Sequence, residues 1–254
     1  MINFPNPDTK IPTDLVIRGK RVVLMPNIQD HDASMQKILS DPITMQHLKF
    51  MCHLPEGWSL EQSASRRVSR NNSQAEGYML NFVIAVPIET LELLPMSPAN
   101  PNDLLDAQPS HTTVPFEILS FPKDLLEKNP GMVAEGSSGK YVVAGMCGLQ
   151  HIDTFSGKAE VGIIVDYRFW RHRIATESLL LTCQYSFEHL RFHKLSFVTD
   201  VVNAPMRKWL ENVAKAQMSY IEKDCVFYDG SFFDYCTYYI YEVDWFNVMS
   251  KLLL

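Results

Sequence analysis

Residues 159–177 decide the fold and read Ala159-Glu160-Val161-Gly162-Ile163-Ile164-Val165-Asp166-Tyr167-Arg168-Phe169-Trp170-Arg171-His172-Arg173-Ile174-Ala175-Thr176-Glu177. The β-branched run predicts a strand, which a short loop connects to the start of a helix. Such a loop directs unpaired N–H groups and the positive end of the helix dipole at one spot, which suits a pyrophosphate. An ordinary turn with exposed basic side chains is the alternative, and this stretch alone leaves both open.

The sequence after this stretch predicts the rest of that helix, then a strand, a second helix, a hairpin and a third helix. Residues 174–190 have the spacing of a helix, and 194–202 read as a strand. Asn203 and Pro205 are suited to begin a helix that ends near Ala216. Asp229-Gly230 between two β-rich runs indicates a hairpin, and 245–254 predict a closing helix.

The chain before it predicts a strand pair, helices and two longer strands. Residues 14–26 read as strand, turn and strand, and Asp30 is suited to cap a helix that extends to Leu39. Helices are also expected over 44–51 and over 59–71, the latter with Ser59 and Gln62 in a capping box. Strands are expected over 78–86 and 141–152.

Residues 87–139 between those strands differ in composition. They contain eight of the fifteen prolines, which deny donors to central strands and break helix interiors. We interpret them as a partly ordered insertion in which 91–94 and 114–119 form short elements.

Composition narrows the class of protein. The 254 residues, 46% of them hydrophobic, predict one domain over 1–254 with a sizeable core. A net charge of −6 with no basic region gives no support for nucleic-acid binding, and no apolar run is long enough for a membrane span. The five cysteines show no zinc spacing, so free thiols, no metal, and a cytoplasmic or nuclear location are expected.

The central stretch resembles the acetyl-CoA-binding motif of the GNAT N-acetyltransferases, in the branch that includes ribosomal-protein-alanine and spermidine acetyltransferases. Eight residues fall on that motif in register: Glu160, Gly162, Asp166, Phe169, Trp170, Ala175, Thr176 and Glu177. The order of the flanking elements agrees as well. The resemblance covers about 14–86 and 140–248, and the insertion lies outside it.

The resemblance implies an α/β (α+β) fold, in which helices flank a mixed, mostly antiparallel sheet of about six to seven strands. It implies acetyl-CoA as co-substrate, with the backbone of Ile164 and Val165 paired to the pantetheine arm. Its pyrophosphate is expected at the amides of six loop and helix residues, namely Arg171, His172, Arg173, Ile174, Ala175 and Thr176. Asn203 is expected near the far end of the coenzyme.

Glu160 is the candidate catalytic base. An ammonium has no lone pair and an ordinary pKa near ~10.4, so transfer to a primary amine needs a base. The alternative is that Glu160 only orients a water molecule or pairs with a structural partner. No cysteine or serine is arranged as an activated nucleophile, so transfer is expected to be direct, to a small-molecule amine or a protein N-terminus.

Two departures from the family pattern favour a second interpretation. Arg171 and Arg173 stand where relatives usually have glycines, and Met206 stands where many have serine. A left-handed backbone at a non-glycine residue costs ~1–2 kcal/mol. The alternative function is therefore a catalytically silent GNAT-like interaction module with weakened coenzyme binding. The sequence does not indicate the oligomeric state.

Overall fold

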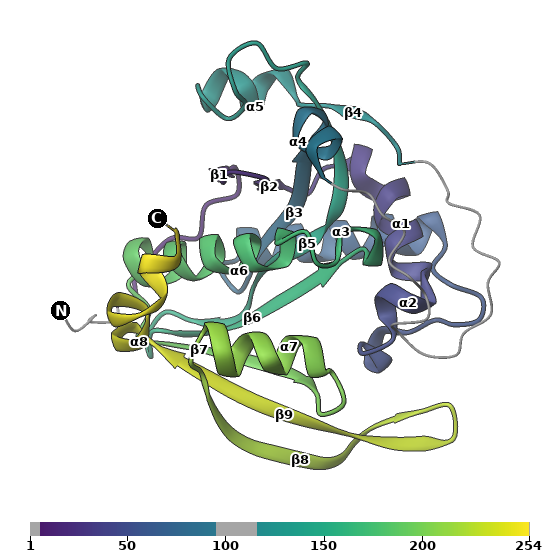
Figure 1. Ribbon diagram of the computed structural model, residues 1–254, viewed down its shortest axis with the longest axis vertical. Helices are drawn as coiled ribbons and strands as arrows, with labels where there is room; N and C mark the ends of the chain where they lie inside the picture. The colour runs from purple at the N-terminus through teal and green to yellow at the C-terminus, as the bar shows by residue number, and fades with distance from the viewer. Residues whose placement is uncertain (1–5, 95–115, 254) are drawn as a thin grey trace.

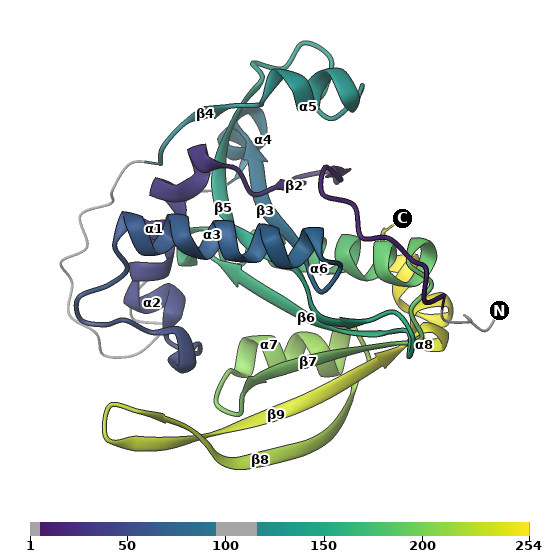
Figure 2. The same ribbon diagram turned by 180° about the vertical axis from the view of Figure 1, so that it is seen from behind.

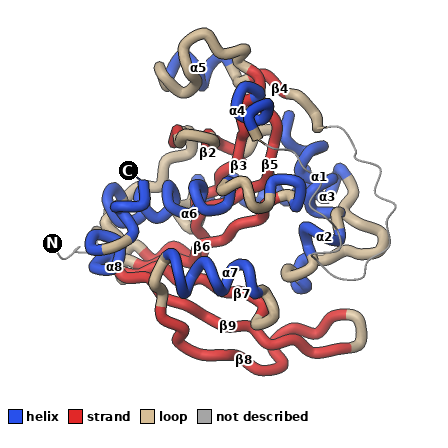
Figure 3. Tube along the Cα trace, in the orientation of Figure 1, coloured by secondary structure: helices blue, strands red, loops and turns tan. Residues whose placement is uncertain are grey.

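A computed structural model describes residues 6–94 and 116–253, which build one nine-stranded sheet with helices on both faces (Figures 1 and 3). The strand order is β1-β2-β3-β5-β6-β7-β9-β8, and β4 pairs separately with β5. The strands are β1 Ile17–Arg18, β2 Val23–Pro26, β3 Leu80–Pro87, β4 Leu119–Ser120, β5 Lys140–Asp153, β6 Lys158–Val165, β7 Lys194–Asp200, β8 Gln217–Tyr228 and β9 Ser231–Tyr241.

Within the described part of the chain, only β6 and β7 pair in parallel, and every other strand pair is antiparallel. This confirms the predicted mixed, mostly antiparallel sheet. The described sheet has nine strands, more than the six to seven that the resemblance implied. The strand, turn and strand expected over 14–26 are present as β1 and β2, and β1 and β4 have only two residues each.

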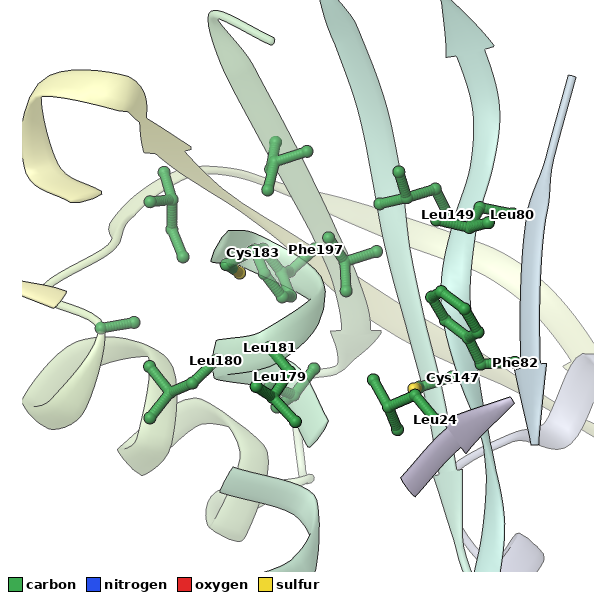
Figure 4. Packing of buried hydrophobic residues seen from close by; sticks show 14 of the residues in the cluster. Leu24, Leu80, Phe82, Cys147, Leu149, Leu179, Leu180, Leu181, Cys183 and Phe197 are labelled. Carbon is green, nitrogen blue, oxygen red and sulfur yellow. The ribbon is translucent and has the colours of Figure 1, made fainter. Parts of the chain in front are cut away.

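The helices divide between the two faces of the sheet (Figures 1 and 2). On one face lie α1 Asp32–Ser40, α2 Pro42–Met45 and α3 Leu60–Ala75; on the other lie α6 Ile174–Gln184, α7 Ala204–Lys208 and α8 Glu242–Asn247. Two apolar clusters correspond to these faces. Figure 4 shows the α6-side cluster, in which Leu179 of α6 and Phe82 of β3 are both buried. The α1-side cluster includes Met146 and Ile164.

Several predicted helix boundaries need correction. Ser59 caps α3 and forms the expected capping box with Gln62. Asp30 does not cap α1, because it lies inside a 3-10 turn, Gln29–His31, and His31 precedes the helix. The helix expected over 44–51 is α2 followed by a separate 3-10 turn, Lys49–Met51, with Asp41 capping α2.

The C-terminal half keeps the predicted order, with wider helical turns at two ends. After α6 the chain continues as a π-helical turn, Tyr185–His189, so the helix expected over 174–190 is present in two forms. After α7 a second π turn, Trp209–Val213, ends short of Ala216. The closing helix begins at Glu242, earlier than predicted, and a 3-10 turn, Met249–Leu253, follows α8.

The proline-rich segment contributes to the sheet. It contains α4 Ile88–Leu93, which begins before the expected 91–94 element, then β4 and α5 Lys123–Lys128. Most of the 114–119 element is not a strand: residues 114 and 115 lie outside the described residues, and pairing begins at Leu119. Arg18 Nη1 donates to the Gly131 carbonyl at 2.6 Å, which ties the segment to β1. Among the described residues, no helix is both long and apolar enough to span a membrane.

Candidate active site

The parallel strands β6 and β7 pair over a short distance and then separate. Their pairing covers Lys158–Glu160 against Lys194–Ser196, whereas β6 extends to Val165 and β7 to Asp200. Both ribbons diverge toward their carboxyl ends in Figure 1. An opening of this kind, at the carboxyl ends of parallel strands, is where open α/β sheets bind ligands.

The exposed edge of β6 at this opening offers main-chain groups of alternate residues. The Asp166 N–H donates to the Ala144 carbonyl of β5 at 2.9 Å. Because strand residues alternate, the main-chain groups of Ile164 also face β5, and those of Ile163 and Val165 face the opening. The Trp170 indole N–H already donates to the Val165 carbonyl at 2.8 Å. The edge available for pairing is therefore centred on Ile163 and the Val165 N–H.

The loop after β6 begins with a 3-10 turn, Tyr167–Phe169, that a buried carboxylate holds. Asp166 accepts the main-chain N–H of Arg168 at 2.9 Å and pairs with the Arg168 guanidinium. The loop then reaches Arg171 at φ 67° and Arg173 at φ 64°, both left-handed. Both side chains are exposed. The loop thus adopts the conformation that glycine favours, at a cost of about 1–2 kcal/mol per residue.

Helix α6 begins directly after Arg173 and presents unpaired amides at its first turn. The first α-helical hydrogen bond runs from the Glu177 N–H to the Arg173 carbonyl at 2.9 Å. The N–H groups of Ile174, Ala175 and Thr176 precede it and have no partner within the helix. His172 differs, because its N–H lies 3.4 Å from the Phe169 carbonyl. First-turn amides and a helix dipole in this arrangement, at the end of β6, suit an anion.

Asn203 lies at the matching end of β7. Its Oδ1 accepts the Met206 N–H at 3.3 Å and so caps α7, while its Nδ2 donates to Thr199 Oγ1 at 2.9 Å. Asn203 and the 166–173 loop both follow the carboxyl end of a strand in the parallel pair. The structure therefore brings Asn203 to the same end of the sheet as the loop, with its amide occupied in capping.

Glu160 lies where β6 and β7 begin to separate, on the face opposite α6. Gln150 Nε2 donates to its Oε1 at 2.5 Å, and His151 Nδ1 lies 3.5 Å from its Oε2. Its side chain is 22% exposed. These contacts orient the carboxylate and leave it open to solvent, which suits either a proton acceptor or a group that positions water.

A cavity of about 250 Å³ opens beside Glu160. Ten residues line it: His151, Lys158, Ala159, Glu160, Lys194, Ser196, Val198, Tyr220, Thr237 and Tyr239. His151 at the end of β5 and Tyr239 of β9 are among these lining residues. No sequence pattern indicated Lys194 or Ser196 as site residues, because only the strand register brings them beside Glu160. Among the described residues, no group of three His, Cys, Asp or Glu side chains is arranged to hold a metal.

Comparison with known proteins finds similarity to acetyltransferases. Residues 115–213 match the acetyltransferase (GNAT) domain family. The match includes β5, β6, the 166–173 loop and α6. An uncharacterized N-acetyltransferase, p20, of Bacillus licheniformis is 24% identical over 108 residues. That alignment covers 39% of this chain and 61% of the relative, so the chain spans less than two thirds of the relative's length.

Solved structures share the fold at low sequence identity. A GCN5-related N-acetyltransferase from Brucella melitensis is similar with a TM-score of 0.62 at 18% identity, covering 94% of this chain and 84% of the other. A GNAT-family acetyltransferase from Bacillus anthracis has a TM-score of 0.58 at 13% identity, with coverages of 90% and 99%. RimL, a ribosomal-protein α-N-acetyltransferase in complex with coenzyme A, has a TM-score of 0.59 at 13% identity, with coverages of 89% and 98%.

Proposed function

We propose that the chain is an N-acetyltransferase that uses acetyl-CoA as acyl donor, because residues 115–213 match the acetyltransferase (GNAT) domain family. The observation that carries the proposal is the opening between β6 and β7. It has the first-turn amides of α6 at one end and the oriented carboxylate of Glu160 at the other. One side of the opening suits a diphosphate, and the other suits a proton transfer.

In this proposal the main chain of β6 binds the pantetheine arm as an added strand. The strand register favours Ile163 with Val165 for this pairing, in place of Ile164 with Val165. The N–H groups of Ile174, Ala175 and Thr176 bind the pyrophosphate, with positive charge from Arg171, His172 and Arg173 nearby. Asn203 positions the start of α7 at the far end of the coenzyme.

Transfer is direct between the two substrates. The amine nitrogen attacks the thioester carbonyl carbon, so a C–N bond forms and the C–S bond breaks. The amine proton passes to Glu160, directly or through one water, and the coenzyme leaves as a thiolate that takes up a proton. With an ordinary thiol pKa near ~8.5, that thiolate is a competent leaving group, so the absence of a serine at Met206 does not prevent the step.

The acceptor in this proposal is a primary amine on a small molecule or at a protein N-terminus. The neighbour RimL acts on a protein N-terminus by its name, which supports the second class. The alternative, a silent module that binds coenzyme weakly, rests on the left-handed Arg171 and Arg173. Both residues are exposed, and this exposure favours the enzyme.

Calorimetric titration with coenzyme A and acetyl-CoA tests the proposal. We expect saturable binding below roughly millimolar concentration in the wild type, and its loss in Ala175→Glu. A glutamate at position 175 interacts favourably with the helix dipole, so the helix should still form, but its negative charge repels the diphosphate. Ala134→Glu adds the same charge at an exposed loop position and is the matched control. Absence of binding in the wild type at millimolar ligand would refute the proposal in favour of the silent module.

A further inference from the structure

Helix α3 carries three arginines, Arg66, Arg67 and Arg70, and two of them have no acidic partner among the described residues. Arg67 forms a two-point ion pair with Asp32, at 2.8 Å from Nε to Oδ1 and 3.0 Å from Nη2 to Oδ2. Arg66 and Arg70, one helical turn apart, form no ion pair with any described carboxylate. Arg66 Nη1 contacts the Met146 sulfur at 3.2 Å, and Arg70 Nε donates to Asn81 Oδ1 at 3.1 Å.

These two guanidinium groups are held in place at an electrostatic cost. Both residues are half-buried, and burial lowers the pKa of Arg66 to about 10. Burial, with the neighbouring positive charge of Arg66, lowers the pKa of Arg70 to about 9. Both groups stay protonated at neutral pH. Two partly desolvated like charges without a counterion are a site where a bound anion would offset the cost.

A buried polar layer fixes the direction of Arg70. Asn81 is fully buried on β3. Its Nδ2 donates to Asn71 Oδ1 at 3.2 Å, and its main-chain N–H donates to Gln74 Oε1 at 3.0 Å. Because Asn81 is held on both sides, its Oδ1 gives the Arg70 Nε a fixed partner. The remaining guanidinium N–H groups of Arg70 have no partner among the described residues, so they are preorganised for an external acceptor.

The strand register places this pair beside Glu160. Asn81 lies opposite Gly148, and Gly148 lies opposite Gly162, across β3, β5 and β6. Glu160 is two residues from Gly162 on β6, so it shares that face, which α3 covers only in part (Figure 2). A Cβ on Gly162 would meet nothing within 4 Å. The space above Gly162 is therefore open between the two arginines and the proposed base.

We propose that Arg66 and Arg70 bind an acidic side chain of a peptide acceptor, in the open space above Gly162. This inference rests on the proposed function and deepens it, since it assigns the acceptor class as an N-terminal peptide segment with Asp or Glu near its amine. Asn81 and Glu160 lie roughly 12 Å apart by strand spacing, which about three to four extended residues span. Lys194, which lines the cavity beside Glu160, adds positive charge on the same face. A polycationic amine would be repelled.

The test compares matched peptides that differ in one charge. The probes are Ser-Ala-Glu-Ala-Ala-Trp and Ser-Ala-Gln-Ala-Ala-Trp, with companion pairs that carry the exchange at the second or fourth residue. Binding is measured by calorimetry on the full chain with coenzyme A present, and kcat/KM for acetylation is measured in parallel. For at least one position, the Glu peptide should bind about tenfold or more tightly than its Gln counterpart, because charge-assisted pairs outweigh neutral ones.

The arginines are tested with a control on the same helix. Arg66→Gln and Arg70→Gln should each reduce the Glu-over-Gln preference, and the double variant should abolish it. Arg67→Gln also removes one positive charge from α3, but the Arg67 guanidinium is already paired with Asp32. The preference for the Glu peptide should therefore persist. If circular dichroism shows that the double variant does not fold, the wild type is measured at high salt instead. Because salt screens charges, 0.5 M NaCl should remove most of the preference for the Glu peptide.

The outcomes separate this inference from the proposed function. Equal binding of every Glu and Gln pair to the wild type, or no binding of either, overturns the inference even if acetylation occurs. A preference that survives the double Arg variant also overturns it. Failure of coenzyme A to bind overturns the proposed acetyltransfer instead, and peptide binding to the coenzyme-free chain then decides the role of the arginines.

Discussion

Gly19 lies so close to Glu177 that a Cβ on Gly19 would come within 2.2 Å of the Glu177 Oε1. That same oxygen accepts the main-chain N–H of Arg21 at 2.9 Å, and the other carboxylate oxygen lies 3.3 Å from Arg21 Nη1. The carboxylate on α6 therefore clamps the turn between β1 and β2. The glycine is required there for close approach, and Glu177, which matches the family motif, has a structural role.

Gly19→Ala should destabilise the fold. The methyl group forces the Glu177 carboxylate away and leaves the Arg21 N–H without its partner, at a cost of about 1–3 kcal/mol. Urea unfolding followed by circular dichroism measures the change in the free energy of unfolding. Gly162→Ala is the control, because its Cβ meets nothing within 4 Å and no left-handed φ is involved. Equal stability of the two variants would contradict the clamp.

Arg173 allows the strain in the loop to be separated from its charge. Arg173→Gly and Arg173→Ala both remove the guanidinium, but only glycine accepts φ 64° at no steric cost. Arg173→Gly should therefore be more stable than Arg173→Ala by about 1 kcal/mol in urea unfolding. Calorimetry should show similar weakening of coenzyme A binding in both, since both lose the same charge.

Arg191 provides the comparison outside the site. It is exposed and has φ 60°, so Arg191→Gly and Arg191→Ala should show the same stability difference without any change in coenzyme affinity. If the Arg173 pair shows no stability difference while the Arg191 pair does, the strain assigned to the 166–173 loop is wrong.

Glu160→Gln should lower kcat while coenzyme binding is retained. The amide keeps the shape and the contact with Gln150 but accepts no proton, so kcat/KM should fall by about 10²–10⁴. Steady-state acetylation of the best acceptor peptide gives the rate, and calorimetry gives the coenzyme Kd. Glu222→Gln on the exposed face of β8 is the matched control. A variant with full activity across pH would remove Glu160 from the base role.

The sequence was sufficient where a local pattern determines the structure. A few neighbouring residues were enough to predict three elements: the strand before Asp166, helix α6 and the hairpin at Asp229-Gly230. The left-handed loop was indicated by two arginines at positions where relatives carry glycine. These elements fix where the proposed coenzyme site lies.

What the sequence could not supply depends on residues far apart in the chain. Arg21 and Glu177 are 156 positions apart, and no local pattern pairs them. The sequence also does not reveal that Arg66 and Arg70 lack an acidic partner, because the neighbouring Arg67 is the same residue type and is paired. The cavity beside Glu160 combines residues from five strands, β5 to β9, that only the register brings together.

His31 is buried beside Tyr141, and this arrangement should make stability depend on pH. The Ile28 N–H points at His31 Nδ1 at 3.2 Å, and Nε2 lies 2.7 Å from the Tyr141 hydroxyl, which fits a neutral ring protonated at Nε2. Burial lowers the pKa of His31 from 6.5 to about 4. Between these values the unfolded chain binds the proton and the folded chain does not, so stability rises with pH from about 4 to 6.5 and then levels off.

The contribution of His31 over that window is about 3 kcal/mol, from ~1.4 kcal/mol per unit of pKa difference. Urea unfolding at pH 7.5, 6 and 5 should therefore show the wild type losing stability faster than His31→Gln as the pH falls. The comparison with the variant is needed because carboxylates also titrate near the lower end of the range. His189→Gln is the control, because His189 is exposed and forms no ion pair with any described residue, and this variant should follow the wild-type profile more closely than His31→Gln does. If His31→Gln and the wild type have parallel pH profiles, the imidazole does not stay neutral in the folded chain, and the His31–Tyr141 contact must then be accounted for with a charged ring.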